Sequence, residues 1–164
     1  MKTSLYIGQI DNSIPYRDRP TVKCIIVKDG LVLILNNGLL PGGGVDTGES
    51  HGDALRREIQ EELGMTICNA KKLRTIIQYR NFLHKRYIID GYVAELDSTN
   101  GLAEPQDEGE AQFTPLWLHV DDAIQLIEDF ILVAKEKPMN NDANQGRLYN
   151  LLTSYELLKQ LRVE

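Results

Sequence analysis

The segment "LLPGGGVDTGESHGDALRREIQEELGM" runs from Leu39 to Met65 and carries three closely spaced glutamates, Glu58, Glu61 and Glu62. In an α-helix, residues at positions i, i+3 and i+4 lie side by side, so these carboxylates would share one helical face. Like charges at such spacings repel one another by roughly 0.2–0.5 kcal/mol per pair on an exposed helix. No lysine or arginine follows them in the segment, which predicts that they lack counter-cations. Helix stability alone therefore does not account for the cluster.

Two interpretations of this acidic face are open. Clustered carboxylates are hard oxygen ligands that suit Mg²⁺ or Mn²⁺, and such ions complete their coordination with water and phosphate. The alternative is a solvated acidic helix surface, which is common in proteins. Leu55, Ile59 and Leu63 form an adjoining apolar stripe that would anchor the helix to a sheet. The acids would then lie at the edge of the buried face, near the glycines.

The same segment contains signals for the start and the end of the helix. Ser50 is a suitable N-cap, with Asp53 three residues later as a capping-box partner. Gly64 is a natural C-terminal stop. The preceding stretch "LPGGGVDTGE" contains a proline and three successive glycines, which predicts a loop.

The rest of the chain alternates between strand and helix patterns. Apolar runs predict a hairpin over residues 21–38, with its turn at Asp29-Gly30, and two antiparallel strands at 71–81 and 86–96. A short strand is expected within 113–120, where Pro115 favours an edge position. Helices are expected at 121–135 and from about 144 to 162. The last of these has an apolar face that predicts a core contact, with a partner interface as the alternative, and it comprises Leu148, Leu151, Leu152, Tyr155 and Leu158. This order predicts an α/β fold, a mixed sheet flanked by helices, in a single domain spanning residues 1–164.

Composition limits the possible classes of function. The 164 residues are 42% hydrophobic, enough for a core, and the net charge of −6 argues against a general nucleic-acid binder. We expect no signal peptide and no membrane span, because no apolar stretch is long enough. Cys24 and Cys68 form no C-x-x-C pair, and this usage is typical of the reducing cytoplasm.

The wider spacing around the three acids follows a specific pattern. A glycine is followed after five residues by a glutamate, and seven more residues lead to an Arg-Glu pair, an apolar residue, a Glu-Glu pair, a glycine and an apolar residue. These positions are Gly43, Glu49, Arg57, Glu58, Ile59, Glu61, Glu62, Gly64 and Met65. The pattern resembles the Nudix box, Gly-x5-Glu-x7-Arg-Glu-apolar-x-Glu-Glu-x-Gly-apolar, with every defining position filled. The resemblance implies a MutT-like Nudix hydrolase with an α/β/α sandwich around a mixed sheet.

The resemblance also implies an activity and a set of roles. The reaction would be Mg²⁺-dependent hydrolysis, with Mn²⁺ possible, of a nucleoside diphosphate linked to another moiety. Glu58, Glu61 and Glu62 would bind the metal, and the backbone carbonyl of Gly43 would add a further ligand. Arg57 would hold Glu49 or a neighbouring acid in place, and Gly64 would have a structural role at the end of the helix. An ordinary surface ion pair is the alternative for Arg57 and Glu49.

The general base remains open at this point. In some relatives it is a glutamate of the box, here Glu61 or Glu58, and in others a glutamate from a later loop. The polar segment 97–112 offers Glu108 and Glu110 for that role, and it would fold over the metal when substrate binds. A merely solvated acidic loop is the alternative.

Substrate specificity lies outside the box. Aromatic and basic side chains that could stack on a base or contact phosphate include Arg19, Tyr79, Arg80, Arg86 and Tyr87. A solvated basic hairpin tip is the alternative. The sequence does not distinguish among a nucleotide sugar, a dinucleotide, a nucleoside triphosphate and a non-nucleotide diphosphate.

Two other functions are open, a non-catalytic nucleotide-sensing Nudix-like module and an RNA 5′-end pyrophosphohydrolase. The retained box acids disfavour the first, and the missing basic stripe disfavours the second. We therefore expect a small-molecule diphosphate as partner, no stable nucleic-acid partner and no membrane. Family resemblance and the apolar faces of the hairpin and the C-terminal helix also suggest a homodimer.

Overall fold

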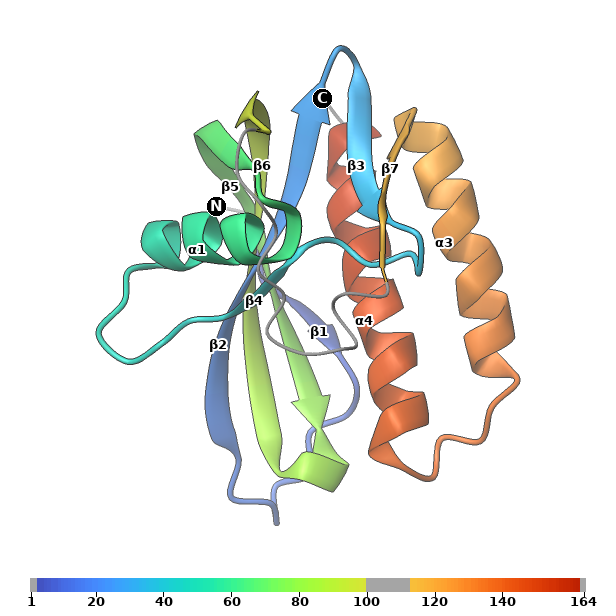
Figure 1. Ribbon diagram of the computed structural model, residues 1–164. Helices are drawn as coiled ribbons and strands as arrows, with labels where there is room; N and C mark the ends of the chain where they lie inside the picture. Colours follow the sequence, from blue (N-terminus) through green and yellow to red (C-terminus); the bar gives the residue numbers. More distant parts are fainter. Residues whose placement is uncertain (1–2, 100–112, 163–164) are drawn as a thin grey trace.

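The computed structural model describes residues 3–99 and 113–162 (Figure 1). Its strands are β1 (Leu5–Ile7), β2 (Arg17–Lys28), β3 (Leu31–Leu35), β4 (Gly42–Gly44), β5 (Thr66–Arg80), β6 (Lys85–Ser98) and β7 (Pro115–Leu118). Its helices are α1 (His51–Leu63), α3 (Val120–Lys135) and α4 (Asp142–Lys159), with short 3₁₀ turns at Asn81–Leu83 and Gln160–Arg162.

The strands within the described residues form one mixed sheet in the order β1-β5-β6-β2-β3-β7, with β4 paired to β2 beside this path. β2 runs parallel to β6 and antiparallel to β3 and β4, while β5 and β6 are antiparallel. β2 thus connects the long β5–β6 pair to the rest of the sheet. The expected mixed sheet and the edge position of Pro115 are confirmed.

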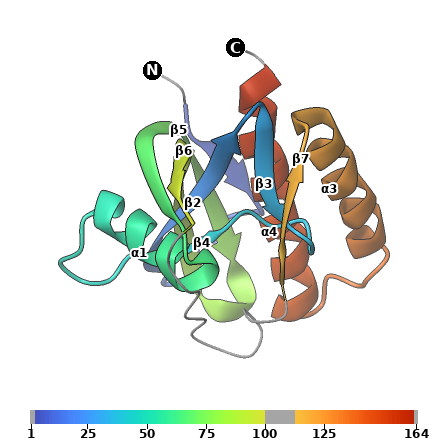
Figure 2. The same cartoon turned by 45° about the horizontal axis from the view of Figure 1, so that its top comes forward.

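The sheet lies between helices, with α1 on one face and α3 and α4 on the other (Figures 1 and 2). Strand side chains alternate between the faces. Val22, Cys24 and Ile26 of β2 therefore pack with Leu55 and Ile59 of α1. The core on the opposite face is larger and is formed with α3 and α4, and its members include Ile25, Ile34, Ile76, Ile124, Ile127 and Leu151. The predicted α/β/α arrangement is confirmed.

The predicted N-cap and C-terminal stop of α1 and the predicted turn of the β2–β3 hairpin are confirmed. The Ser50 hydroxyl accepts a hydrogen bond from the backbone N–H of Asp53 at 3.1 Å, and Gly64 ends the helix in the left-handed conformation. Asp29 and Gly30 both have positive φ, 50° and 77°, as a two-residue hairpin turn requires.

One prediction about the glycines was wrong. Residues Gly42–Gly44 form strand β4, because they pair in register with Thr21, Val22 and Lys23 of β2. Gly42 has a φ of 140°, and a side chain there would collide with the Val22 carbonyl, so this close approach of two backbones requires glycine.

Helix α4 packs against the sheet through polar as well as apolar side chains. The predicted apolar face is in or against the core, as expected. Beside it, the buried side chain of Gln78 donates to Thr153 at 2.7 Å, and Ser154 accepts from the backbone N–H of Leu40 at 3.1 Å. Because much of this face is covered within the chain, it offers little support for the homodimer, which stays a prediction.

Candidate active site

Arg57 is the centre of a hydrogen-bond network that joins α1 to the loop before it. Its Nε and Nη2 donate to the two carboxylate oxygens of Glu49 at 2.8 and 3.0 Å. Its Nη1 donates to Glu58 at 2.9 Å and to Glu61 at 3.2 Å, and Nη2 also donates to the Gly44 carbonyl at 2.9 Å. The predicted role of Arg57 in holding Glu49 agrees with this geometry. The prediction that the glutamates lack a counter-cation was wrong, because Arg57 precedes them on the same helix and reaches two of them.

The carboxylate of Glu58 lies against the backbone of β4. A side chain on Gly43 would place its first carbon 2.5 Å from the Glu58 carboxyl group, so this contact depends on glycine. Glu58 is 9% exposed, and burial, aided by the nearby charge of Glu61, raises its pKa above the ordinary value, although Arg57 and Lys23 oppose the shift. A raised pKa means that burial destabilises the charged carboxylate of Glu58, and a cation bound here would stabilise it.

The pairing of β4 with β2 decides where the glycine carbonyls point. The Pro41 carbonyl accepts a hydrogen bond from the Cys24 N–H, and the Val45 N–H donates to the Pro20 carbonyl. Gly43 lies midway between Pro41 and Val45 and pairs with Val22, so its backbone groups also point towards β2. Since backbone groups alternate along a strand, the carbonyls of Gly42 and Gly44 turn away from β2. This alternation favours the Gly42 carbonyl over the predicted Gly43 carbonyl as a possible metal ligand.

Lys23 and the third glutamate also converge on the outward side of Gly42. The Lys23 ammonium donates to the carbonyls of Leu40 and Gly42, both at 3.2 Å. Glu62 accepts from the backbone N–H of Gly42 at 3.1 Å. The sequence analysis missed Lys23, because it lies within an apolar strand and only the pairing of β2 with β4 brings it to the site.

A divalent ion such as Mg²⁺ needs several oxygen donors around one point. Within residues 3–99 and 113–162, no three acidic, histidine or cysteine side chains are gathered as a ready metal site. Instead, Glu58 and Glu61 each share an oxygen with Arg57, while Glu62 points to Gly42. The donors are nevertheless carboxylate and outward carbonyl oxygens on one helix and one strand, the chemistry that Mg²⁺ and Mn²⁺ prefer. The residues present therefore fit such an ion.

The five predicted substrate contacts separate into different environments. Arg80 is buried and donates to both oxygens of Asp142 of α4, at 2.9 and 2.8 Å, and its guanidinium lies over the Tyr87 ring. Arg86 forms a similar paired contact with Asp18, at 2.7 and 2.8 Å. The Tyr79 ring is buried and contacts the rings of Tyr6 and Tyr16.

Arg19 differs from the other two arginines in this set. Its side chain is exposed, and among residues 3–99 and 113–162 no hydrogen-bond or ion-pair partner exists for its guanidinium. Its neighbour across the parallel β2–β6 pair is Tyr87. The Arg19 guanidinium lies against Gly44 of β4, whereas Arg80 and Arg86 have acidic partners elsewhere. The predicted Glu108 and Glu110 lie outside the described residues.

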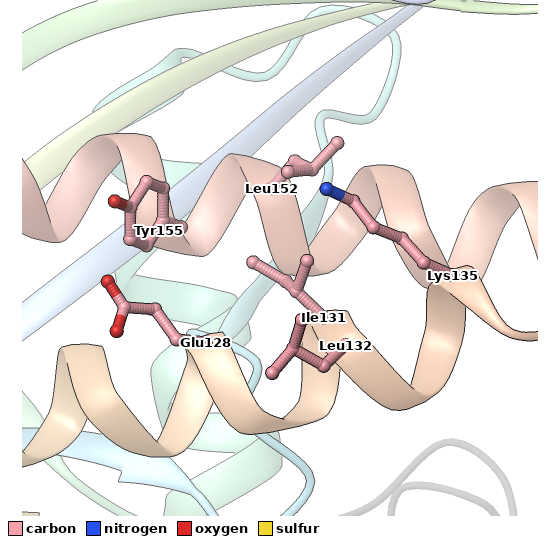
Figure 3. A pocket seen from close by; sticks show the side chains of 6 residues that line it. All are labelled: Glu128, Ile131, Leu132, Lys135, Leu152 and Tyr155. Atoms are coloured by element: carbon pink, nitrogen blue, oxygen red, sulfur yellow. The ribbon is translucent and has the colours of Figure 1, made fainter.

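Two further features lie apart from the Arg57 network. On the α1 face of the sheet, the buried Asp90 accepts from Thr75 at 2.6 Å and contacts Lys72 and His51, each at 2.9 Å. This cluster fastens the start of α1 to β6 and β5. A pocket between α3 and α4 is lined by Glu128, Ile131, Leu132, Lys135, Leu152 and Tyr155 (Figure 3). It contains no residue of the box pattern.

Comparison with known proteins agrees with this fold. Residues 17–138 match the model of the NUDIX domain, so the chain belongs to the Nudix family. No match was found among curated proteins. None of the described helices is long and apolar enough to cross a membrane.

Several solved structures have a similar fold. The MutT Nudix hydrolase from Burkholderia pseudomallei has a TM-score of 0.53 and 23% identity, over 82% of this chain and 98% of that chain. The mMutator MutT protein from Bacillus halodurans has a TM-score of 0.54 and 21% identity, over 76% and 84%. The E. coli ORF135 protein has a TM-score of 0.52 and 21% identity, over 76% and 96%. At these identities the similarity establishes the Nudix fold and leaves the substrate open.

Proposed function

We propose that this Nudix protein is a Mg²⁺- or Mn²⁺-dependent hydrolase that cleaves the diphosphate bond of a nucleoside diphosphate linked to another moiety. The observation that carries the proposal is the Arg57 network, which holds Glu58 and Glu61 beside the glycine strand. A solvated acidic surface would not require one arginine to order two acids of its own helix, Glu49 and a backbone carbonyl together. Two free thiols, Cys24 and Cys68, suit the cytoplasmic location expected from the sequence.

In this proposal Glu58, Glu61 and Glu62 hold the divalent ion, with the Gly42 or Gly43 carbonyl as a further donor. When bound, the ion would neutralise charge on the phosphate oxygens and activate water for attack on phosphorus. Arg57 keeps the two nearest carboxylates oriented through fixed donors, since a guanidinium presents its N–H groups in a rigid plane. The glycines leave room for substrate phosphate and backbone to come close together.

The general base in this proposal is either Glu61 or one of Glu108 and Glu110. A base contributes about 10²- to 10⁴-fold in rate, so individual substitutions can identify it.

The single domain spanning residues 1–164 is also proposed. In a non-catalytic nucleotide sensor the same site would bind a nucleotide without cleaving it. In an RNA 5′-end hydrolase it would accept the 5′ end of an RNA as substrate.

The test is a hydrolysis screen over nucleotide sugars, dinucleotides, nucleoside triphosphates, non-nucleotide diphosphates and triphosphorylated RNA, with Mg²⁺ and with Mn²⁺, in which added phosphatase or pyrophosphatase converts the phosphomonoester or pyrophosphate products to measurable phosphate. We expect metal-dependent release from at least one diphosphate, and loss of most of it in Glu61→Gln and Glu62→Gln with the fold retained. Binding of a nucleotide without hydrolysis under either ion would favour the sensor. Activity confined to triphosphorylated RNA would favour the 5′-end hydrolase.

A further inference from the structure

Three of the four basic side chains of β2 lie on one face of the sheet, and Lys28 at the end of the strand has the opposite alternation. Arg17, Arg19 and Lys23 occupy alternate positions with Ile25, which belongs to the core beneath α3 and α4. The residue between the two arginines, Asp18, points to the α1 face, where it binds Arg86. Positive charge therefore collects on the α3/α4 face of β2, in a chain whose net charge is −6.

On that face the Arg19 guanidinium lies where a side chain on Gly44 would otherwise be. A first side-chain carbon on Gly44 would overlap the Arg19 guanidinium. Gly44 has no positive φ, so its backbone conformation does not require glycine. The space that it provides is what allows the guanidinium to rest on β4.

A comparison with Arg80 shows what is unusual here. The guanidinium of Arg80 lies over Gly146 in the same way, but it is buried and bound to both oxygens of Asp142. The guanidinium of Arg19 is exposed and has no such acid within the described part of the chain. One arginine is a completed structural contact, whereas the other presents its donors to solvent.

Arg19 and Glu58 lie against opposite faces of strand β4. Glu58 lies against Gly43 from the α1 face, and Arg19 lies against the next residue, Gly44, from the opposite face. Among the described strands, β4 pairs only with β2, and the groups on its other edge bind Lys23, Glu62 and Arg57 instead of a further strand. A ligand that reaches this edge would meet the Glu58 carboxylate on one side and the Arg19 guanidinium on the other.

We propose that Arg19, cradled by Gly44, is the anion subsite that selects substrates with a second phosphoryl group next to the group held at Glu58, Glu61 and Glu62. This inference rests on the proposed function and adds a residue that discriminates between a diphosphate and a monophosphate. A guanidinium binds phosphate through charge-assisted hydrogen bonds. Loss of one such hydrogen bond corresponds to a fall in affinity of about 10- to 100-fold.

The experiment measures binding of inorganic pyrophosphate and of inorganic phosphate by calorimetry in the presence of Mn²⁺. Arg19→Gln should weaken pyrophosphate binding about 10- to 100-fold while binding of Mn²⁺ alone is unchanged. Gly44→Ala keeps the charge but displaces the guanidinium, so it should weaken pyrophosphate binding in the same direction. Arg17→Gln is the matched control, an exposed arginine on the same strand and face, and should change binding less than twofold.

Hydrolysis of the substrate found in the screen provides the second measurement. Arg19→Gln should raise KM more than it lowers kcat, and Arg19→Lys should recover part of the loss. The inference is overturned if Arg19→Gln and Gly44→Ala bind pyrophosphate as tightly as the unchanged protein, or if Arg17→Gln loses as much. Because pyrophosphate binding needs no turnover, a protein without hydrolytic activity would contradict the proposed function and still test this subsite.

Discussion

Arg57 of α1 grips Glu49 of the preceding loop with two parallel hydrogen bonds, 2.8 Å from Nε and 3.0 Å from Nη2. The same guanidinium contacts Glu58 and Glu61, so the position of the loop and the orientation of two proposed metal ligands depend on one side chain. This shared dependence leads to the first two predictions.

The Glu49–Arg57 contact should make stability depend on pH in acid. Hydrogen bonding to Arg57 lowers the pKa of Glu49 from 4.5 to about 2. A group whose pKa is lower in the folded state stabilises the fold above its unfolded pKa, and this contribution is lost as pH falls towards the folded pKa. The difference in Tm between the unchanged protein and Glu49→Gln should therefore be constant above about pH 5.5 and shrink between pH 4.5 and 2. Thermal melts across this range check it, and a constant difference would contradict it.

Arg57→Lys should lower kcat by about 10²-fold, because an ammonium cannot bridge both oxygens of Glu49 while also contacting the other acids. The fold should survive, since Arg57 is half-buried and lysine keeps its positive charge. Arg56→Lys is the control, because Arg56 is largely exposed and its ion pair within the described residues is with Asp53, at 3.1 Å. Equal losses in the two variants, measured at saturating metal, would refute a special role for Arg57.

Gly43→Ala should displace the Glu58 carboxylate and weaken Mn²⁺ binding at least tenfold, because the added carbon would lie 2.5 Å from it. Gly52→Ala is the matched variant. Its added carbon meets nothing closer than the flexible Arg56 side chain at 3.5 Å, and alanine favours the helix by up to about 1 kcal/mol. Calorimetric titration with Mn²⁺ compares them, and unchanged binding in Gly43→Ala would place Glu58 outside the metal site.

Arg80→Met should destabilise the fold by roughly 2–3 kcal/mol, because it leaves the Asp142 carboxylate without its paired donors at the start of α4. Urea denaturation measures the change, with Arg74→Met as a control, since the hydrogen bond of Arg74 within the described part of the chain is a long one, 3.4 Å to the Thr3 carbonyl. If Arg80→Met instead kept its stability and raised KM, Arg80 would be a substrate contact, as the sequence alone suggested.

One of Glu108→Gln and Glu110→Gln should lower kcat by about 10²- to 10⁴-fold with metal binding retained, if the base comes from the segment after β6. The other should change little. Near-normal kcat in both single variants and in the double variant would make Glu61 the better candidate for the base.

The features that sequence predicted well are governed by short-range physics. The caps of α1 and the Asp29-Gly30 turn depend on a few neighbouring residues, so their signals were complete within the sequence. The contact between Arg57 and Glu61 is also local, at a spacing of four residues, and helical geometry could have revealed it before the structure.

The features that sequence missed depend on which strands become neighbours. Strand β4 exists only because β2 lies beside the glycines, and the same pairing brings Lys23 to the Gly42 carbonyl. Likewise, Arg80 and Asp142 are 62 positions apart, so no local pattern connects them. In the sequence Arg80 and Arg86 looked equivalent, and only the structure shows that they bind different acidic partners.

The alternation along β2 also determines which kinds of genetic change the site can tolerate. Val22 pairs with Gly43 on one side and Asp90 on the other, so the strand is fixed in register on both edges. With Val22 kept in register, a single-residue insertion or deletion between Arg19 and Val22 would turn the side chains before it to the opposite face. Asp18, which now binds Arg86, would exchange faces with Arg19. Length, more than residue identity, should therefore be the most tightly constrained property of this strand in functional variants.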